Sequence, residues 1–247
     1  MPGPTPDRAL KALADAVDGV AGDDDSDARI PVAATVVLLR EGGDGPEVLL
    51  LERPDRGSFA GAWVFPGGKL DDADRHDAGE TEEAVARRAG VREVEEECGL
   101  VLAPQALVAL SCWNPPTGVA PRIRTWFFAA AAPEGDLTLS ADEAVDSQWV
   151  RPADILARHG RGELTLYPPT WVTLHRLIEH ADVGSVLDAA RLAGLERFQS
   201  VARRGAEGPM LLWEGDAEYG PDAEASASAS RHRLEIGALP WRYSRSD

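Results

Sequence analysis

The chain has 247 residues, 44% of them hydrophobic, which is enough for one large domain or for a domain with an appendage. Its formal net charge of −17 disfavours duplex nucleic acid and anionic membranes as partners, because binding to their phosphates rests on clustered Lys and Arg side chains. Residues 1–29 show no secretory signal pattern and no long uncharged apolar run follows, so we expect a cytoplasmic protein without a nucleic acid or membrane partner.

The N-terminal third of the chain is predicted to begin with a peripheral segment and to continue with strands. Residues 1–29 suggest a short helix followed by an acidic linker at 22–27. Residues 30–40 and 47–53 are rich in β-branched and apolar residues on either side of a Gly-rich turn, which predicts a hairpin. A short strand at 63–65 stops at Pro66, and two glycines then let the backbone approach a ligand closely.

Further strands and helices are predicted after a polar loop at 69–79 and a helical segment at 80–98. The expected strands span 105–113, 122–131, 136–139 and 146–150, and the expected helices span 152–159, 168–180 and 184–193. Strands around one acidic helix, with more helices after them, predict an α/β (α+β) fold, an α-β-α sandwich around a mixed sheet.

Residues 196–247 are predicted to form a C-terminal extension that packs on a main domain spanning 30–195. Its parts are a strand at 209–214, a low-complexity segment at 222–230 and a terminal β-hairpin at 231–243.

The most informative stretch is residues 92–100, R-E-V-E-E-E-C-G-L. On a helix, Glu93, Glu96 and Glu97 share one face, where each like-charge pair costs about 0.2–0.5 kcal/mol. A hard divalent cation such as Mg²⁺, which prefers oxygen ligands, offsets that repulsion. The plain alternative is a solvated acidic helix. Gly99 is expected to end the helix in the left-handed conformation.

Residues 92–100 resemble R-E-U-x-E-E-x-G-U, the second half of the Nudix box, where U is a bulky apolar residue. The first half should be a Gly six positions before a Glu, which itself lies eight positions before the Arg. Gly68 precedes Arg92 by 24 positions where the standard box has 14, which implies ten inserted residues. The position eight before Arg92 is Ala84, and the candidates to substitute for the missing acid are Glu80, Glu82 and Glu83.

Residues 59–74 resemble the G-x-x-V-F-P-G-G-x-x-D-x-x-D stretch of Nudix hydrolases related to the peroxisomal coenzyme A diphosphatases. The longer coenzyme A signature of other members is absent, since residues 58–61 read S-F-A-G. The resemblance implies a Nudix-type fold and hydrolysis of the diphosphate linkage of a nucleoside diphosphate joined to another moiety. Coenzyme A or its acyl derivatives lead as substrate. An ADP-ribose or NADH type of diphosphatase and a non-catalytic nucleotide sensor are the alternatives.

The resemblance also implies a set of site residues. The metal ligands, for Mg²⁺ or Mn²⁺, would be Glu93, Glu96, Glu97 and the Gly68 carbonyl. The catalytic residues would be Glu93, Glu97, Arg92 as the group that orients the glutamates, and Glu143 as a further ligand or base. The candidates for substrate phosphate contacts are Arg53, Lys69, Arg122 and Arg124, and the aromatic candidates to stack on a base are Phe59, Trp63, Trp113 and Trp126.

Two further expectations concern the loop at 69–79 and the assembly. The aspartates of the loop either face water or, at Asp71 or Asp74, anchor the loop by accepting backbone N–H groups at a helix start. The expected partner is a small-molecule nucleoside diphosphate derivative, and a homodimer is the one assembly we put forward.

Overall fold

The computed structural model describes Lys11 and residues 30–56, 59–118, 122–140, 142–220 and 230–246. The predicted acidic linker, nearly all of the predicted N-terminal helix and nearly all of the low-complexity segment at 222–230 lie outside these residues. Within the described ranges, no helix is long and apolar enough to cross a membrane.

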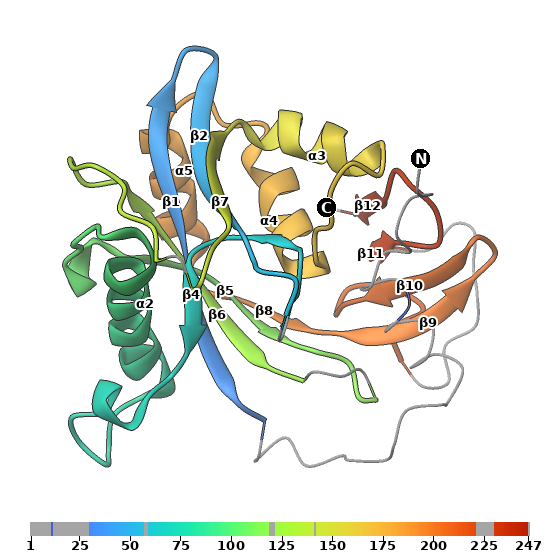
Figure 1. The fold of residues 1–247 in the computed structure, drawn as a ribbon. Coiled ribbons are helices and arrows are strands. Elements are labelled where there is room, and N and C mark those ends of the chain that lie inside the picture. Colours follow the sequence, from blue (N-terminus) through green and yellow to red (C-terminus); the bar gives the residue numbers. More distant parts are fainter. Residues whose placement is uncertain are drawn as a thin grey trace.

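An eight-stranded mixed sheet forms the centre of the molecule (Figure 1). The strand order is β3-β2-β1-β6-β5-β8, with β4 paired to β1 and β7 paired to β2. The pairs β1–β6 and β5–β8 are parallel and the other pairs are antiparallel. The strands are β1 Val32–Gly42, β2 Gly45–Glu52, β3 Trp63–Val64, β4 Gly67–Lys69, β5 Val108–Asn114, β6 Arg124–Ala131, β7 Asp146–Val150 and β8 Glu196–Gln199.

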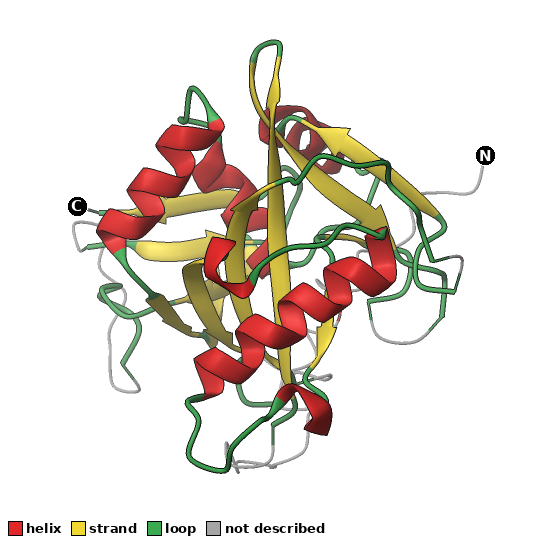
Figure 2. Ribbon diagram, turned by 90° about the vertical axis from the view of Figure 1, so that its left-hand side faces the viewer, coloured by secondary structure: helices red, strands yellow, loops and turns green. Residues whose placement is uncertain are grey.

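Helices cover both faces of this sheet, because the side chains of β1 alternate between two apolar clusters. Val36 and Leu38 pack toward helix α2, Glu82–Cys98. Val37 and Leu39 pack toward α3 Pro152–Gly160, α4 Pro168–Leu177 and α5 Val183–Ala193. Figure 2 shows α2 crossing in front of the strands, on the face opposite to the other three helices. The predicted α-β-α sandwich is confirmed.

Helix α2 begins and ends where its capping residues place it. The Thr81 hydroxyl accepts the Ala84 N–H at the first turn, and Gly99 ends the helix with φ 70° and ψ 8°. Gly90 lies inside the helix against β1, where an added Cβ would come within 3.0 Å of the Val36 side chain. The glycine that lowers helix propensity therefore lets α2 lie close to the sheet.

The C-terminal part forms a second, antiparallel sheet in the order β12-β11-β10-β9. Its strands are β9 Val201–Gly205, β10 Gly208–Leu212, β11 His232–Glu235 and β12 Arg242–Arg245. The terminal hairpin is present as predicted. The side chain of Trp213, after β10, is fully buried, with its ring centre 5.6 Å from that of Trp113 and 5.4 Å from that of Phe198. The two sheets therefore share one apolar core, and the division at residue 195 stays a prediction.

Several predicted boundaries are wrong, for local reasons. Residues 136–139 form no strand, because the Thr138 and Ser140 N–H groups bond instead to the Cys98 and Glu97 carbonyls at the end of α2. Helix α4 ends at Leu177 rather than at 180. The strands β4, β8 and β9 were not predicted, because each has at most five residues and no apolar alternation.

The shared core predicts that Trp213→Ala destabilises the whole molecule. Loss of this buried ring should lower the free energy of unfolding by about 3–5 kcal/mol in one cooperative transition. Chemical denaturation measures it, with Leu192→Ala as the control because Leu192 is 91% exposed. Two separate transitions, only one of them shifted, would contradict a shared core.

Candidate active site

A cavity of about 670 Å³ opens on the face of the central sheet opposite to the apolar surface that α2 covers. Its floor comes from β4, β1, β6 and β5, and residues of the C-terminal part close one end. Among the described residues, the charged groups that line it are Arg53, Lys69, Glu93, Glu97 and Glu143. The site predictions can therefore be checked residue by residue.

Glu97 is the most buried carboxylate of the site, with 2% of its side chain exposed. Its Oε2 accepts the Gly67 N–H at 2.8 Å, and its Oε1 accepts Arg53 Nη1 at 2.8 Å. The pKa of Glu97 is raised to about 7, because burial and the charges of Glu93 and Glu143 outweigh the lowering effects of the Gly67 hydrogen bond and the Arg53 charge. Binding of a cation would therefore stabilise the ionised form of this carboxylate.

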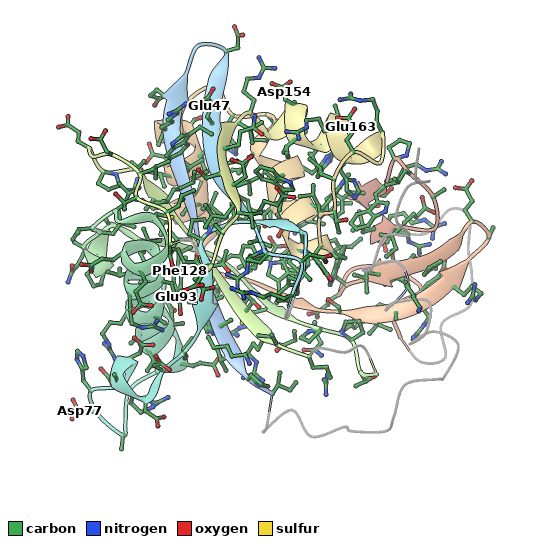
Figure 3. The ribbon with its side chains drawn as sticks, viewed as in Figure 1. Glu47, Asp77, Glu93, Phe128, Asp154 and Glu163 are labelled. Atoms are coloured by element: carbon green, nitrogen blue, oxygen red, sulfur yellow. The ribbon has the colours of Figure 1, made fainter. Side chains whose placement is uncertain are left out.

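Glu93 lies against the glycine turn. An added Cβ on Gly68 would come within 2.5 Å of the Glu93 carboxylate, so only glycine leaves that carboxylate its place. Burial is also the main cause of the raised pKa of Glu93. Figure 3 shows Glu93 beside the sheet, where α2 meets it. The two glycines thus do two things: one donates its N–H to Glu97 and the other makes room for Glu93.

Arg92 connects the acidic helix to the preceding loop. Its guanidinium contacts Glu93 at 2.8 Å and Glu96 at 2.9 Å on the helix, and donates to the Lys69 carbonyl at 3.0 Å. It also makes two bonds to Asp74, of 3.2 and 3.0 Å. The Asp74 hydrogen bond is the largest cause of the raised pKa of Arg92, which keeps this arginine charged.

Asp74 is the acid that the sequence analysis missed. It lies six positions after Gly68, where the box pattern places its first acid, so the inserted residues follow Asp74 rather than precede it. The three candidates named from the sequence have other partners. Glu80 pairs with Arg88, Glu82 with Arg124 and Glu83 with Arg87. Counting forward from Gly68, instead of backward from Arg92, identifies the residue.

The loop is anchored at Asp74. Asp74 is 5% exposed and accepts the Asp71 N–H at 2.8 Å. Asp71, Asp72 and Asp77 are exposed. Figure 3 shows Asp77 at the outer tip of the loop, well away from Glu93. Both expectations for the loop therefore hold, for different aspartates.

The remaining site predictions divide into residues inside and outside the cavity. Glu143 lines it and contacts Arg53 at 3.1 Å, and Lys69 lines it at the glycine turn. Glu96 does not line it, since its side chain is 57% exposed and paired with Arg92. Phe59 and Trp113 line the cavity but Trp63 and Trp126 do not, and Tyr167, which was not singled out, does.

Arg122 and Arg124 are corrected, because neither lines the cavity. Alternation along β6 puts Ile123 and Thr125 on the cavity side instead. Arg124 faces α2, where it contacts Glu82 at 2.9 Å. The sequence did not indicate which face of the strand meets the cavity.

The carboxylates of the site suit a divalent metal ion. Among the described residues, no three carboxylate, His or Cys groups converge closely enough to hold an ion by themselves. Mg²⁺ commonly uses one or two carboxylates, with water and substrate phosphates as its other ligands. Glu93 and Glu97, both with raised pKa and both on the cavity wall, fit that requirement.

The Arg92–Asp74 contact predicts that Asp74→Asn lowers both stability and kcat/KM. Loss of the charged hydrogen bonds should lower the free energy of unfolding by about 1.5–3 kcal/mol. Glu93 would also lose its fixed orientation, and Asp74→Glu should recover part of kcat/KM. Thermal denaturation and steady-state kinetics measure these effects, with Asp77→Asn on the exposed tip as the control. Equal effects of the Asp74→Asn and Asp77→Asn substitutions would refute the anchoring role.

Comparisons with known proteins show the family and the fold. The family model for the NUDIX domain matches residues 29–168, more than half of the 247-residue chain. A Nudix hydrolase from Alicyclobacillus acidocaldarius has the same fold, with a TM-score of 0.58 and 23% identity over 65% of this chain and 96% of its own.

Two other solved structures are more distant. One is a MutT Nudix hydrolase from Burkholderia pseudomallei, with a TM-score of 0.46 and 24% identity over 60% of this chain and 98% of its own. The other is the Nudix domain of Shewanella oneidensis NrtR in complex with ADP ribose, with a TM-score of 0.48 and 17% identity over 63% of this chain and 90% of its own. From the family match and the fold together, the chain belongs to the Nudix family of hydrolases, which act on nucleoside diphosphate derivatives.

Proposed function

We propose that this protein is a metal-dependent diphosphatase that cleaves the diphosphate linkage of a nucleoside diphosphate joined to another moiety. The observation that carries the proposal is a pair of carboxylates, the half-buried Glu93 and the buried Glu97, beside the Gly67–Gly68 turn on the wall of a cavity of about 670 Å³. Pockets of this size hold ligands as large as a nucleotide.

Each residue of the charged end has a proposed role. Glu93, Glu97 and the Gly68 carbonyl would hold Mg²⁺ or Mn²⁺. Such an ion neutralises the diphosphate and lowers the pKa of an attacking water. Arg53 contacts both Glu97 and Glu143. Its guanidinium is therefore the first proposed phosphate contact, placed between these two carboxylates. Lys69, exposed at the turn, is the second phosphate contact, and Glu143 is the candidate base.

The finer substrate assignment rests on the sequence alone. The resemblance of residues 59–74 favours coenzyme A or its acyl derivatives, and the absent longer signature favours the ADP-ribose or NADH type. A nucleotide sensor is the third candidate. Two carboxylates with raised pKa at a cavity wall favour an enzyme over a sensor, because a bound cation would offset the desolvation that their arginine partners leave uncompensated.

The deciding experiment is a product-resolved screen of nucleoside diphosphate derivatives with Mg²⁺. Turnover should vanish in excess EDTA and return with metal. Glu97→Gln keeps the size of the side chain but removes its charge, so kcat should fall about 10²–10³-fold with the fold intact. Circular dichroism checks the fold.

Glu95→Gln is the matched control for Glu97→Gln. Glu95 lies on the same helix, but it is exposed and outside the cavity lining. Its substitution should leave kcat within about twofold. Equal losses at the two positions, or hydrolysis that is undiminished by chelator, would overturn the mechanism.

The raised pKa of Glu97 also predicts a pH-dependent metal requirement. A carboxylic acid binds the ion only after losing its proton, and without metal the pKa of Glu97 is about 7. The Mg²⁺ concentration for half-maximal activity should therefore rise about tenfold per pH unit below 7 and level off above pH 8. Metal titrations at pH 6, 7, 8 and 9 measure it. A flat requirement across that range would mean that Glu97 does not exchange a proton for the ion.

A further inference from the structure

The cavity has a charged end and a neutral half. All five charged groups of its described lining belong to the site around Glu97. The remaining lining is apolar, aromatic or uncharged polar, with Phe59, Trp113, Ile123, Tyr167 and Leu211 as its main walls. Residues 57–58 and 119–121, which flank the lining in sequence, contain no charged residue either. We call the part bounded by these five walls the neutral half.

The sheet register places Trp113, one wall of the neutral half, beyond the reach of Lys69. Lys69 pairs with Ala33, Ala33 with Thr125, and Thr125 with Trp113, across β4, β1, β6 and β5. Neighbouring strands lie about 4.8 Å apart, so Trp113 is about 14 Å from Lys69 along this row. The other cation of the lining, Arg53, is bound to Glu97 and Glu143.

Aromatic rings in fixed positions shape the neutral half. Phe59 and Tyr167 meet edge to face, with ring centres 4.7 Å apart. Phe59 has φ 60°, which is uncommon for a residue other than glycine and indicates that its surroundings hold it there. The ring of Trp113 is stacked on Phe198 at 3.8 Å, so it presents a rigid wall. Preformed aromatic walls bind planar rings at a low cost in conformational entropy.

The C-terminal part supplies the end of the neutral half. Ser200, between β8 and β9, and Leu211 of β10 both line the cavity. The Ser200 hydroxyl accepts Trp213 Nε1 at 2.9 Å, which fixes that side chain against the shared core. Both residues lie outside the range matched by the family model, residues 29–168.

We propose that the neutral half receives an uncharged, ring-bearing group of the substrate and rejects a group that carries an additional phosphate. The inference rests on the proposed function, because it concerns the same cavity. A phosphate placed here would lose water and find no Lys or Arg in the described lining, and an unpaired buried charge is strongly unfavourable. The preferred substrates are therefore nucleoside diphosphate derivatives without a further phosphate on either moiety.

Two pairs of compounds test this proposal, because the members of each pair differ by one phosphate: NADH with NADPH, and dephospho-coenzyme A with coenzyme A. We expect kcat/KM with Mg²⁺ to be at least tenfold higher for the member that lacks the phosphate, mainly through KM. An equal or higher kcat/KM for the phosphorylated member of any pair that is turned over overturns the inference.

A cation placed in the neutral half should weaken this discrimination. Ile123 is half-buried on the cavity wall, and Ile123→Arg supplies the missing charge there. We expect the preference to fall at least threefold, with Thr125→Lys as the second variant in case the first does not fold. Val101→Arg is the control, since Val101 is 66% exposed and does not line the cavity. An unchanged preference in a folded Ile123 or Thr125 variant overturns the inference.

Failure of the proposed function can be distinguished from failure of this inference. If none of the nucleoside diphosphate derivatives of the screen is hydrolysed, the diphosphatase proposal fails. Calorimetric binding of the same pairs to the wild-type protein then decides the inference. Tighter binding of the member without the extra phosphate supports a neutral half, whereas equal binding or no binding overturns it.

Discussion

The contact between Arg92 and Asp74 is the interaction on which the geometry of the site depends. Three acidic side chains, Glu93, Glu96 and Glu97, share one face of the last two turns of α2, and their repulsion needs a cation. Arg92 supplies it for Glu93 and Glu96, and Arg53 supplies it for Glu97. Asp74 in turn holds Arg92 in place, since it is itself buried and bonded to the loop backbone. The helix, the inserted loop and the glycine turn are thus fixed to one another through two arginines.

Burial of Glu97 stores free energy that ligand binding can release. The side chain is 2% exposed and its pKa is about 7, so the ionised form is held at a cost. At this end of the cavity, a divalent cation would compensate the carboxylates and a diphosphate would compensate the cations. Arg53, bonded to Glu97 and Glu143, balances the same carboxylates in the structure described here. A strongly shifted pKa of this kind is typical of functional sites.

The sequence indicated the acidic helix well but placed other parts less precisely. Glycine at 99 and the spacing of Glu93 and Glu97 carry local information that fixes the end and the phase of α2. The strand β8 is polar and short, and only its pairing with β5 makes it a strand. The side of β6 that meets the cavity is likewise set by packing against α2, which alternation alone does not reveal. Asp74 can be identified from the sequence as the acid of the box, but only by counting forward from Gly68.

The lining of the cavity extends beyond the range matched by the family model. The charged end uses residues between Arg53 and Glu143, all inside the range matched by the family model, so the chemistry we propose follows from the family. The neutral half is closed by Ser200 and Leu211, which lie beyond that range. Ser200 and Leu211 are held by the shared core around Trp213. The buried ion pair of Arg233 with Asp216, at 2.7 Å, connects β11 to the turn after β10. Under the proposed selection, Ser200 and Leu211 add to the walls that the family range supplies. Because none of these walls belongs to the box, the box sequence predicts the reaction and not the substrate.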